Sequence, residues 1–124
     1  MLVSRVPVVD PRSGEPGQHP DGSVQLINQR TVTPAGQQSP LGDYPINAIL
    51  SPDGMRLVVS NSGAGIQSLQ VVDTNTGQVI QSIPYLLPDS VFFGLAYSSD
   101  GSHVYASGGG NNVIHTYSVA VTAN

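Results

Sequence analysis

The chain contains no cysteine, and no lysine occurs anywhere in its 124 residues. The lack of cysteine excludes a disulfide framework and a thiolate metal site. Charged residues are also scarce: they form 10% of the chain, against roughly 25% in a typical soluble domain, and the formal net charge is −4. An acidic chain with four scattered arginines is not expected to bind nucleic acid or an anionic membrane surface.

Long apolar runs are missing as well. Arg5, Pro7 and Asp10 interrupt the opening stretch, so it lacks the apolar core of about 7–15 residues that a signal peptide needs. No run approaches the roughly 20 residues of a membrane span. The sequence therefore predicts no export signal and no membrane span. Residues 1–22 are rich in proline, glycine and polar residues, which predicts a flexible tail with order beginning near residue 23.

What the chain does contain is a repeat. The stretch AILSPDGMRLVVSNSG (48–63) recurs in degenerate form as LAYSSDGSHVYASGG (95–109), and Gly54 and Gly101 set an offset of 47 residues. Asp-Gly between two apolar runs favours a tight hairpin turn, because this dipeptide readily supplies positive φ angles. We therefore expect residues 46–50 to pair with 56–60, and 92–97 with 103–107. A period of this size is typical of repeat architectures.

The repeat unit extends beyond the hairpin. A third strand, SLQVVD (68–73), matches IHTYSV (114–119), and a fourth, GQVIQSI (77–83), has an upstream counterpart in GQQSPL (36–41). Two further short strands are expected around a turn at residues 28–29, over 24–27 and 30–32. Four short antiparallel strands joined by hairpins form the blade of a β-propeller.

The predicted fold is therefore all-β, an incomplete propeller of about two blades in residues 23–124. A strand at 37–41 closes a preceding blade, blade one covers about 45–83, and blade two covers about 91–119 without its outer strand. Propellers have roughly 4–8 blades, so one chain is not expected to close a ring. Both outer sheet faces and the last strand edge are expected to be open to water or to partners.

The chain resembles the YVTN or YncE-like β-propeller family in two stretches, RTVTPAGQQSPLGDYPINAILSPDGMRLVVSNSGAGIQSLQVVDTNTGQVIQSI and FFGLAYSSDGSHVYASGGGNNVIHTYSV. Its turns are also similar to those of other propeller repeats. The resemblance covers about residues 21–119. Its more specific motifs are TPAG (33–36), SLQVVDTNTG (68–77) and FFGLAYSSDGSHVYASGGGNN (92–112). In particular, the chain resembles the propeller that precedes a phosphoesterase domain of the alkaline phosphatase superfamily in exported bacterial proteins.

That resemblance implies a closed ring of about seven blades in the parent protein, of which this chain is the first portion. It also implies an exported parent. The metal-binding residues of the phosphoesterase superfamily belong to a domain that this sequence does not contain, so no catalytic residue can be transferred to it. The sequence predicts no catalytic residue, no metal site and no cofactor.

Individual polar residues support the same interpretation. The histidines share no metal-ligand spacing, and the serines that follow strands lack a nucleophile elbow or a paired histidine. Aspartates at turns or strand ends are expected to accept local backbone N–H bonds, with a cation contact as the alternative. These residues are His19, His103 and His115, then Ser51, Ser62 and Ser98, then Asp53, Asp73 and Asp100.

Two glycine-rich loops are the candidate ligand or partner sites. Each connects the second and third strands of its unit, where glycine lets backbone N–H groups face an anion. The alternative is tight loop geometry, because no helix follows as it does in phosphate-binding loops. The candidate residues are Asn61, Gly63, Gly65, Gly108, Gly109, Asn111 and Asn112.

Three functions remain open. The first is a non-catalytic scaffold or interaction module, whose partners are the remaining blades, another copy or other proteins. The second is part of a propeller lactonase or sugar-acid hydrolase, whose carboxylates and asparagines meet in a central channel, and here the first strands offer only Asn47. In the third, copies complete a ring, with residues 24–41 supplying strands to a neighbour's open edge.

Overall fold

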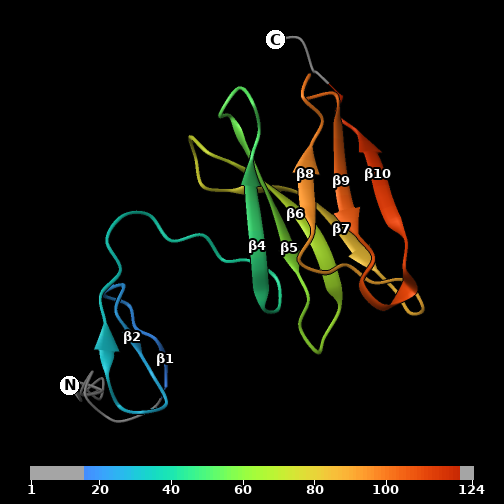
Figure 1. Cartoon of the computed structure of the whole chain (residues 1–124). Helices are drawn as coiled ribbons and strands as arrows, with labels where there is room; N and C mark the ends of the chain where they lie inside the picture. The colour runs from blue at the N-terminus through green and yellow to red at the C-terminus, as the bar shows by residue number, and fades with distance from the viewer. Residues whose placement is uncertain (1–15, 121–124) are drawn as a thin grey trace, which may run out of the picture. The chain divides into compact units, whose positions relative to one another are not determined.

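The computed structural model describes residues 16–120 and divides the chain into two compact units, Met1–Gln38 and Ser39–Asn124. The all-β prediction is confirmed: the described residues form antiparallel sheets of three, four and three strands, with one 3-10 turn, η1 (Gly109–Asn111) (Figure 1). Most of the expected N-terminal tail, residues 1–15, lies outside the described residues. Within the described range, no helix has the length and apolar character to cross a membrane.

The N-terminal unit contains a small antiparallel sheet of β1 (Gly17–Gln18), β2 (Val24–Gln25) and β3 (Thr31–Val32), in the order β1-β2-β3. Residues 16–22 were expected in the tail, and the structure corrects this, because β1 pairs with β2. The turn between them has Gly22 at φ 81°, and the Asp21 carboxylate accepts the Ser23 N–H at 2.9 Å. This local turn lets two very short segments pair.

The second unit contains two larger sheets. Their strands are β4 (Pro45–Leu50), β5 (Arg56–Asn61), β6 (Gln67–Asp73) and β7 (Val79–Tyr85), then β8 (Leu95–Tyr97), β9 (His103–Ser107) and β10 (Ile114–Ser118). Each sheet is a meander in chain order. The sequence predicted that this strand begins at residue 92, but β8 begins at Leu95. The segment before it still bonds to Ser107: the Phe92 N–H donates to the Ser107 carbonyl at 2.9 Å, and the Gly94 N–H donates to the Ser107 hydroxyl at 2.9 Å.

The pairing register reproduces the repeat position by position. Ile49, Val58 and Val71 lie opposite one another in the four-stranded sheet. Their counterparts 47 or 45 residues later, Ala96, Tyr105 and Thr116, lie opposite one another in the β8–β10 sheet. The predicted offsets are thus confirmed as a geometric equivalence of three strands.

The expected strand at 37–41 is not formed. Residues 33–44, all of them described, contain no strand. Gly36 has φ 86°, close to the 68° of Gly77, so the predicted turn is present without a ladder after it. Strand β3, the neighbour that such a strand requires, is two residues long. The Gln38 amide instead donates to the Gly22 carbonyl at 2.9 Å.

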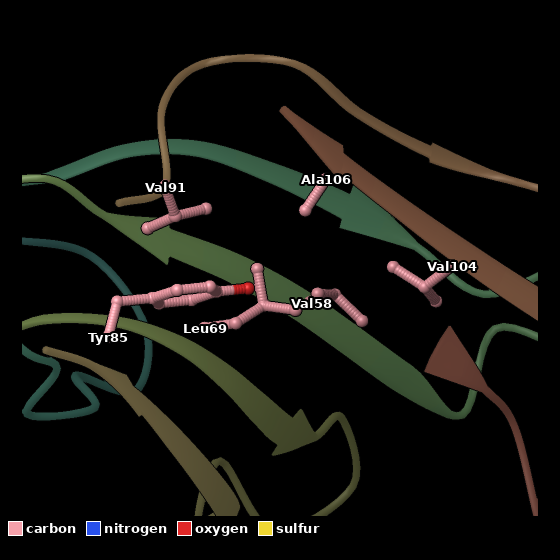
Figure 2. Close-up of a cluster of buried hydrophobic side chains, with 6 residues drawn as sticks. All are labelled: Val58, Leu69, Tyr85, Val91, Val104 and Ala106. Carbon is pink, nitrogen blue, oxygen red and sulfur yellow. The ribbon is translucent and has the colours of Figure 1, made fainter. Parts of the chain in front are cut away.

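The core of the second unit lies between its two sheets (Figure 2). Val58 and Leu69 project from the four-stranded sheet toward Val104 and Ala106 of the other, and each is at most 4% exposed. Tyr85 at the end of β7 and Val91 in the following connector complete the cluster. A fully buried aliphatic side chain contributes about 1.5–3 kcal/mol, so this contact holds the two sheets face to face.

Candidate functional site

The two Asp-Gly turns are copies of one another in their hydrogen bonds. The Ser51 hydroxyl donates to the Asp53 carboxylate at 2.6 Å, and Ser98 does the same to Asp100 at 2.6 Å. The Arg56 N–H donates to the Ser51 hydroxyl oxygen at 2.9 Å. Only the glycines have positive φ, so the turn is wider than the two-residue hairpin that the dipeptide suggested. Ser51 and Ser98 are turn-closing groups.

The three turn aspartates are held as carboxylates by these contacts. The hydrogen bond from the Ser51 hydroxyl has the largest lowering effect on the pKa of Asp53, and the bond from the Met55 N–H has the second largest. The hydrogen bond from the Ser98 hydroxyl lowers the pKa of Asp100. The backbone N–H of Thr76 lowers the pKa of Asp73, which also meets the Arg56 guanidinium at 3.2 Å. The expected role of these residues in turns is confirmed.

One serine does lie beside a histidine, which the sequence did not indicate. The Ser102 hydroxyl is 2.8 Å from the Asp100 carboxylate and 2.7 Å from His103 Nδ1. Because the carboxylate can only accept, the hydroxyl donates to it, and His103 Nδ1 must donate to the hydroxyl. A nucleophilic serine needs the opposite arrangement, with the imidazole accepting its proton. The cluster closes a turn and does not activate Ser102.

The first glycine-rich loop folds around a carboxylate of the chain itself. The Gly65 N–H donates to Asp43 Oδ2 at 2.8 Å, and the Gly63 N–H donates to the Asp43 carbonyl at 3.1 Å. A Cβ at Gly63 would lie 2.2 Å from the Asp43 carboxyl carbon. The backbone donors that were candidates for an external anion are thus used by Asp43, a residue that the sequence reasoning did not single out.

Asn61 begins that loop as a buried residue. It is 0% exposed, and its Nδ2 donates to the Gln70 amide oxygen at 3.0 Å and to the Ser68 hydroxyl at 3.1 Å. The same Gln70 oxygen accepts the Gly42 N–H at 2.8 Å. Asn61 Oδ1 and Ser60 Oγ are buried without a hydrogen-bond partner in the described part of the chain. The Gln70 oxygen thus links the entering segment to the sheet, and Asn61 is bound to the same oxygen.

The second loop is closed by its own backbone. The Gly108 N–H donates to the Val113 carbonyl at 2.8 Å, and the Asn112 N–H donates to Gly109 at 3.2 Å. Gly109 and Asn112 have left-handed φ angles of 55° and 54°. The Asn111 amide reaches the Pro88 carbonyl in the preceding connector. Both candidate loops are thus bound to the connector that enters their sheet.

Polar contacts between the sheets were not expected from the sequence. The Tyr85 and Tyr117 hydroxyls are hydrogen-bonded at 2.5 Å, and burial raises the pKa of Tyr85. His115 Nε2 lies 3.0 Å from the Ser90 carbonyl, so this nitrogen carries the proton. Asn47, the channel candidate, donates to the Phe93 carbonyl at 2.7 Å. Each contact joins one sheet to the other or to the connector.

A third copy of the turn was also missed. Pro20-Asp21-Gly22 repeats Pro52-Asp53-Gly54, and the Gly22 N–H binds the His19 carbonyl at 3.0 Å as the Gly54 N–H binds Ser51 at 2.9 Å. The recurrence of Pro-Asp-Gly was the available signal. His19 therefore lies in a turn and is remote in sequence from His103 and His115.

The described residues contain no group of three or more histidine, aspartate or glutamate side chains placed to hold a metal ion. Comparison with protein-family models and with curated protein sequences finds no match to this chain.

Proposed function

We propose that this chain is a segment of a β-propeller of the YVTN or YncE-like kind and acts as a non-catalytic scaffold or interaction module. The equivalence of the two packed sheets carries the proposal: their strands share one register, one turn and one loop position. In repeat architectures each unit buries its apolar face only against its neighbour, so such a piece presents surfaces more than it builds a reaction centre.

The polar residues support this choice over a propeller hydrolase. A hydrolase of that kind needs side chains that are free to converge on substrate or metal. Here Asp53, Asp73 and Asp100 hold turns, and Asn47 is bound to a backbone carbonyl. Under this proposal a phosphoesterase activity of an exported parent protein would belong to another domain.

Hydrolysis assays on the purified full chain test the proposal. A lactone and a phosphate monoester are incubated with the chain, with and without added Ca²⁺, Zn²⁺ or Mn²⁺. We expect rates equal to those of the buffer controls, because Asp53, Asp73 and Asp100 are bound within turns and Asn47 is bound to a backbone carbonyl. Metal-dependent turnover that Asn47→Ala abolishes would overturn the proposal in favour of a hydrolase.

A further inference from the structure

The outer face of the β8–β10 sheet is an exposed copy of a buried surface. Ala96, Tyr105 and Thr116 lie side by side on it, with Ile114 one pair further along. Ile114 is 72% exposed and Tyr105 is 38% exposed. The equivalent positions of the four-stranded sheet are Ile49, Val58, Val71 and Leu69, which the second sheet covers. Because its positions match those of a covered face, this outer face is expected to be covered by another sheet as well.

The complementary surface occurs on the back of the four-stranded sheet. Val58 and Leu69 share their cluster with Leu95, Tyr97, Val104 and Ala106 of the second sheet and with Val91 of the connector before it. The counterparts of the latter five, 47 residues earlier, are Ala48, Leu50, Leu57, Val59 and Tyr44. Tyr44 is 70% exposed and Leu50 is 57% exposed, whereas Val59 is buried. The accessible part of this back face thus runs along β4.

We propose that a second copy of this chain docks head to tail, with the outer face of one β8–β10 sheet against the β4 side of the next copy's four-stranded sheet. The inference rests on the proposed function, since it assumes that these sheets behave as repeat units. The chain carries both halves of a contact that it already makes internally, and neither half contains a charged residue. Contacts between two different surfaces propagate into rings or open chains.

Light scattering after size exclusion of the full chain, over a series of concentrations, tests this docking. We expect oligomers, as closed rings or open chains, that dissociate on dilution. Ile114→Asp damages the outer face alone, and Leu50→Asp damages the back face alone. Each should weaken self-association by about ten-fold or more, because a charge replaces an aliphatic side chain that the docked copy would bury. Leu87→Asp, at a connector position that is 95% exposed, is the matched control and should associate like the wild type.

Mixing the two variants distinguishes head-to-tail docking from a symmetric contact. Ile114→Asp retains an intact back face and Leu50→Asp an intact outer face, so the mixture should form a heterodimer and nothing larger. Both substituted side chains are exposed within one chain, so both variants should keep the circular dichroism spectrum of the wild type.

A wild-type chain that stays monomeric at every concentration overturns the docking proposal. So does an oligomer or aggregate that survives both substitutions, or a pair of variants that fails to recombine. These outcomes leave the scaffold proposal standing if hydrolysis is absent. Metal-dependent turnover would overturn the scaffold proposal whatever the state of association.

Discussion

At the scale of single residues, a hydroxyl and a carboxylate close each repeat turn. Asp100 accepts hydrogen bonds from Ser98 and Ser102, and Asp53 accepts one from Ser51. These donors lower the carboxyl pKa from the ordinary value of 3.8. A lowered folded-state pKa contributes stability that is present above the ordinary pKa and is lost as the pH falls through the folded-state pKa.

The acid dependence of stability tests this role of Asp100. Asp100→Asn should lower the thermal midpoint at about pH 7, and the gap to the wild type should narrow as the pH falls below the ordinary value of 3.8, because the unfolded chain then binds a proton that the folded Asp100 carboxylate resists. Asp53→Asn should behave in the same way, because its turn makes the matching contacts. A gap that does not narrow as the pH falls would contradict the proposed contribution of charge.

The close approach of Asp43 to Gly63 makes a second residue-scale prediction. Gly63→Ala should destabilise the chain by about 1–3 kcal/mol, because the new Cβ would lie 2.2 Å from the Asp43 carboxyl carbon. Gly110→Ala, whose Cβ would meet nothing within 4 Å, is the matched control. Urea unfolding measures both. If the contact is the cause, Gly63→Ala costs less in an Asp43→Ala background, and an equal cost there would contradict it.

At the scale of elements, the sequence predicted the strands whose partners lie within one hairpin. Asp-Gly turns and alternating apolar residues act locally, so β4, β5 and β9 appear where they were expected. The prediction of a strand at 37–41 was wrong, because a strand needs a neighbouring strand to pair with and β3 is only two residues long. The strand propensity of a segment does not show whether a neighbouring strand is present to pair with it.

The candidate loops show the same limit. The glycines of the two loops were predicted from their position between strands, and the structure confirms that position. Their partners Asp43 and Pro88 lie in connectors more than 20 residues away, as the separations of 22 and 23 residues in these hydrogen bonds show. No local sequence pattern relates residues so far apart. The hydrogen bonds that the loop groups make to Asp43 and Pro88 could therefore be identified only in the structure.

Packing between the two large sheets gives the prediction at this scale. Leu69→Ala should destabilise the second unit by about 2–5 kcal/mol, because Leu69 is 2% exposed and its removal leaves a cavity between the sheets. Leu87→Ala, at a position that is 95% exposed, should change stability by no more than about 0.5 kcal/mol. Chemical denaturation of both variants measures the difference. Similar small losses would mean that the sheets do not share one core.

At the scale of the whole molecule, the boundary between the two units leaves the entire buried core in the second unit. Every member of the buried cluster, from Val58 to Ala106, belongs to the unit Ser39–Asn124. The entering connector that binds the first loop, with Gly42 and Asp43, belongs to it as well. The short strands of Met1–Gln38 contribute none of these side chains.

A fragment of residues 39–124 should therefore fold by itself. We expect a cooperative thermal transition and a β-type circular dichroism spectrum. In ¹H–¹⁵N correlation spectra, the amide signals of Val58 and Ala106 should remain at their positions in the full chain, because their surroundings lie within the fragment. The reciprocal fragment, 1–38, should show no cooperative transition, since sheets of two-residue strands bury too little apolar surface to offset chain entropy. Loss of the transition in 39–124 would mean that the core depends on residues before Ser39.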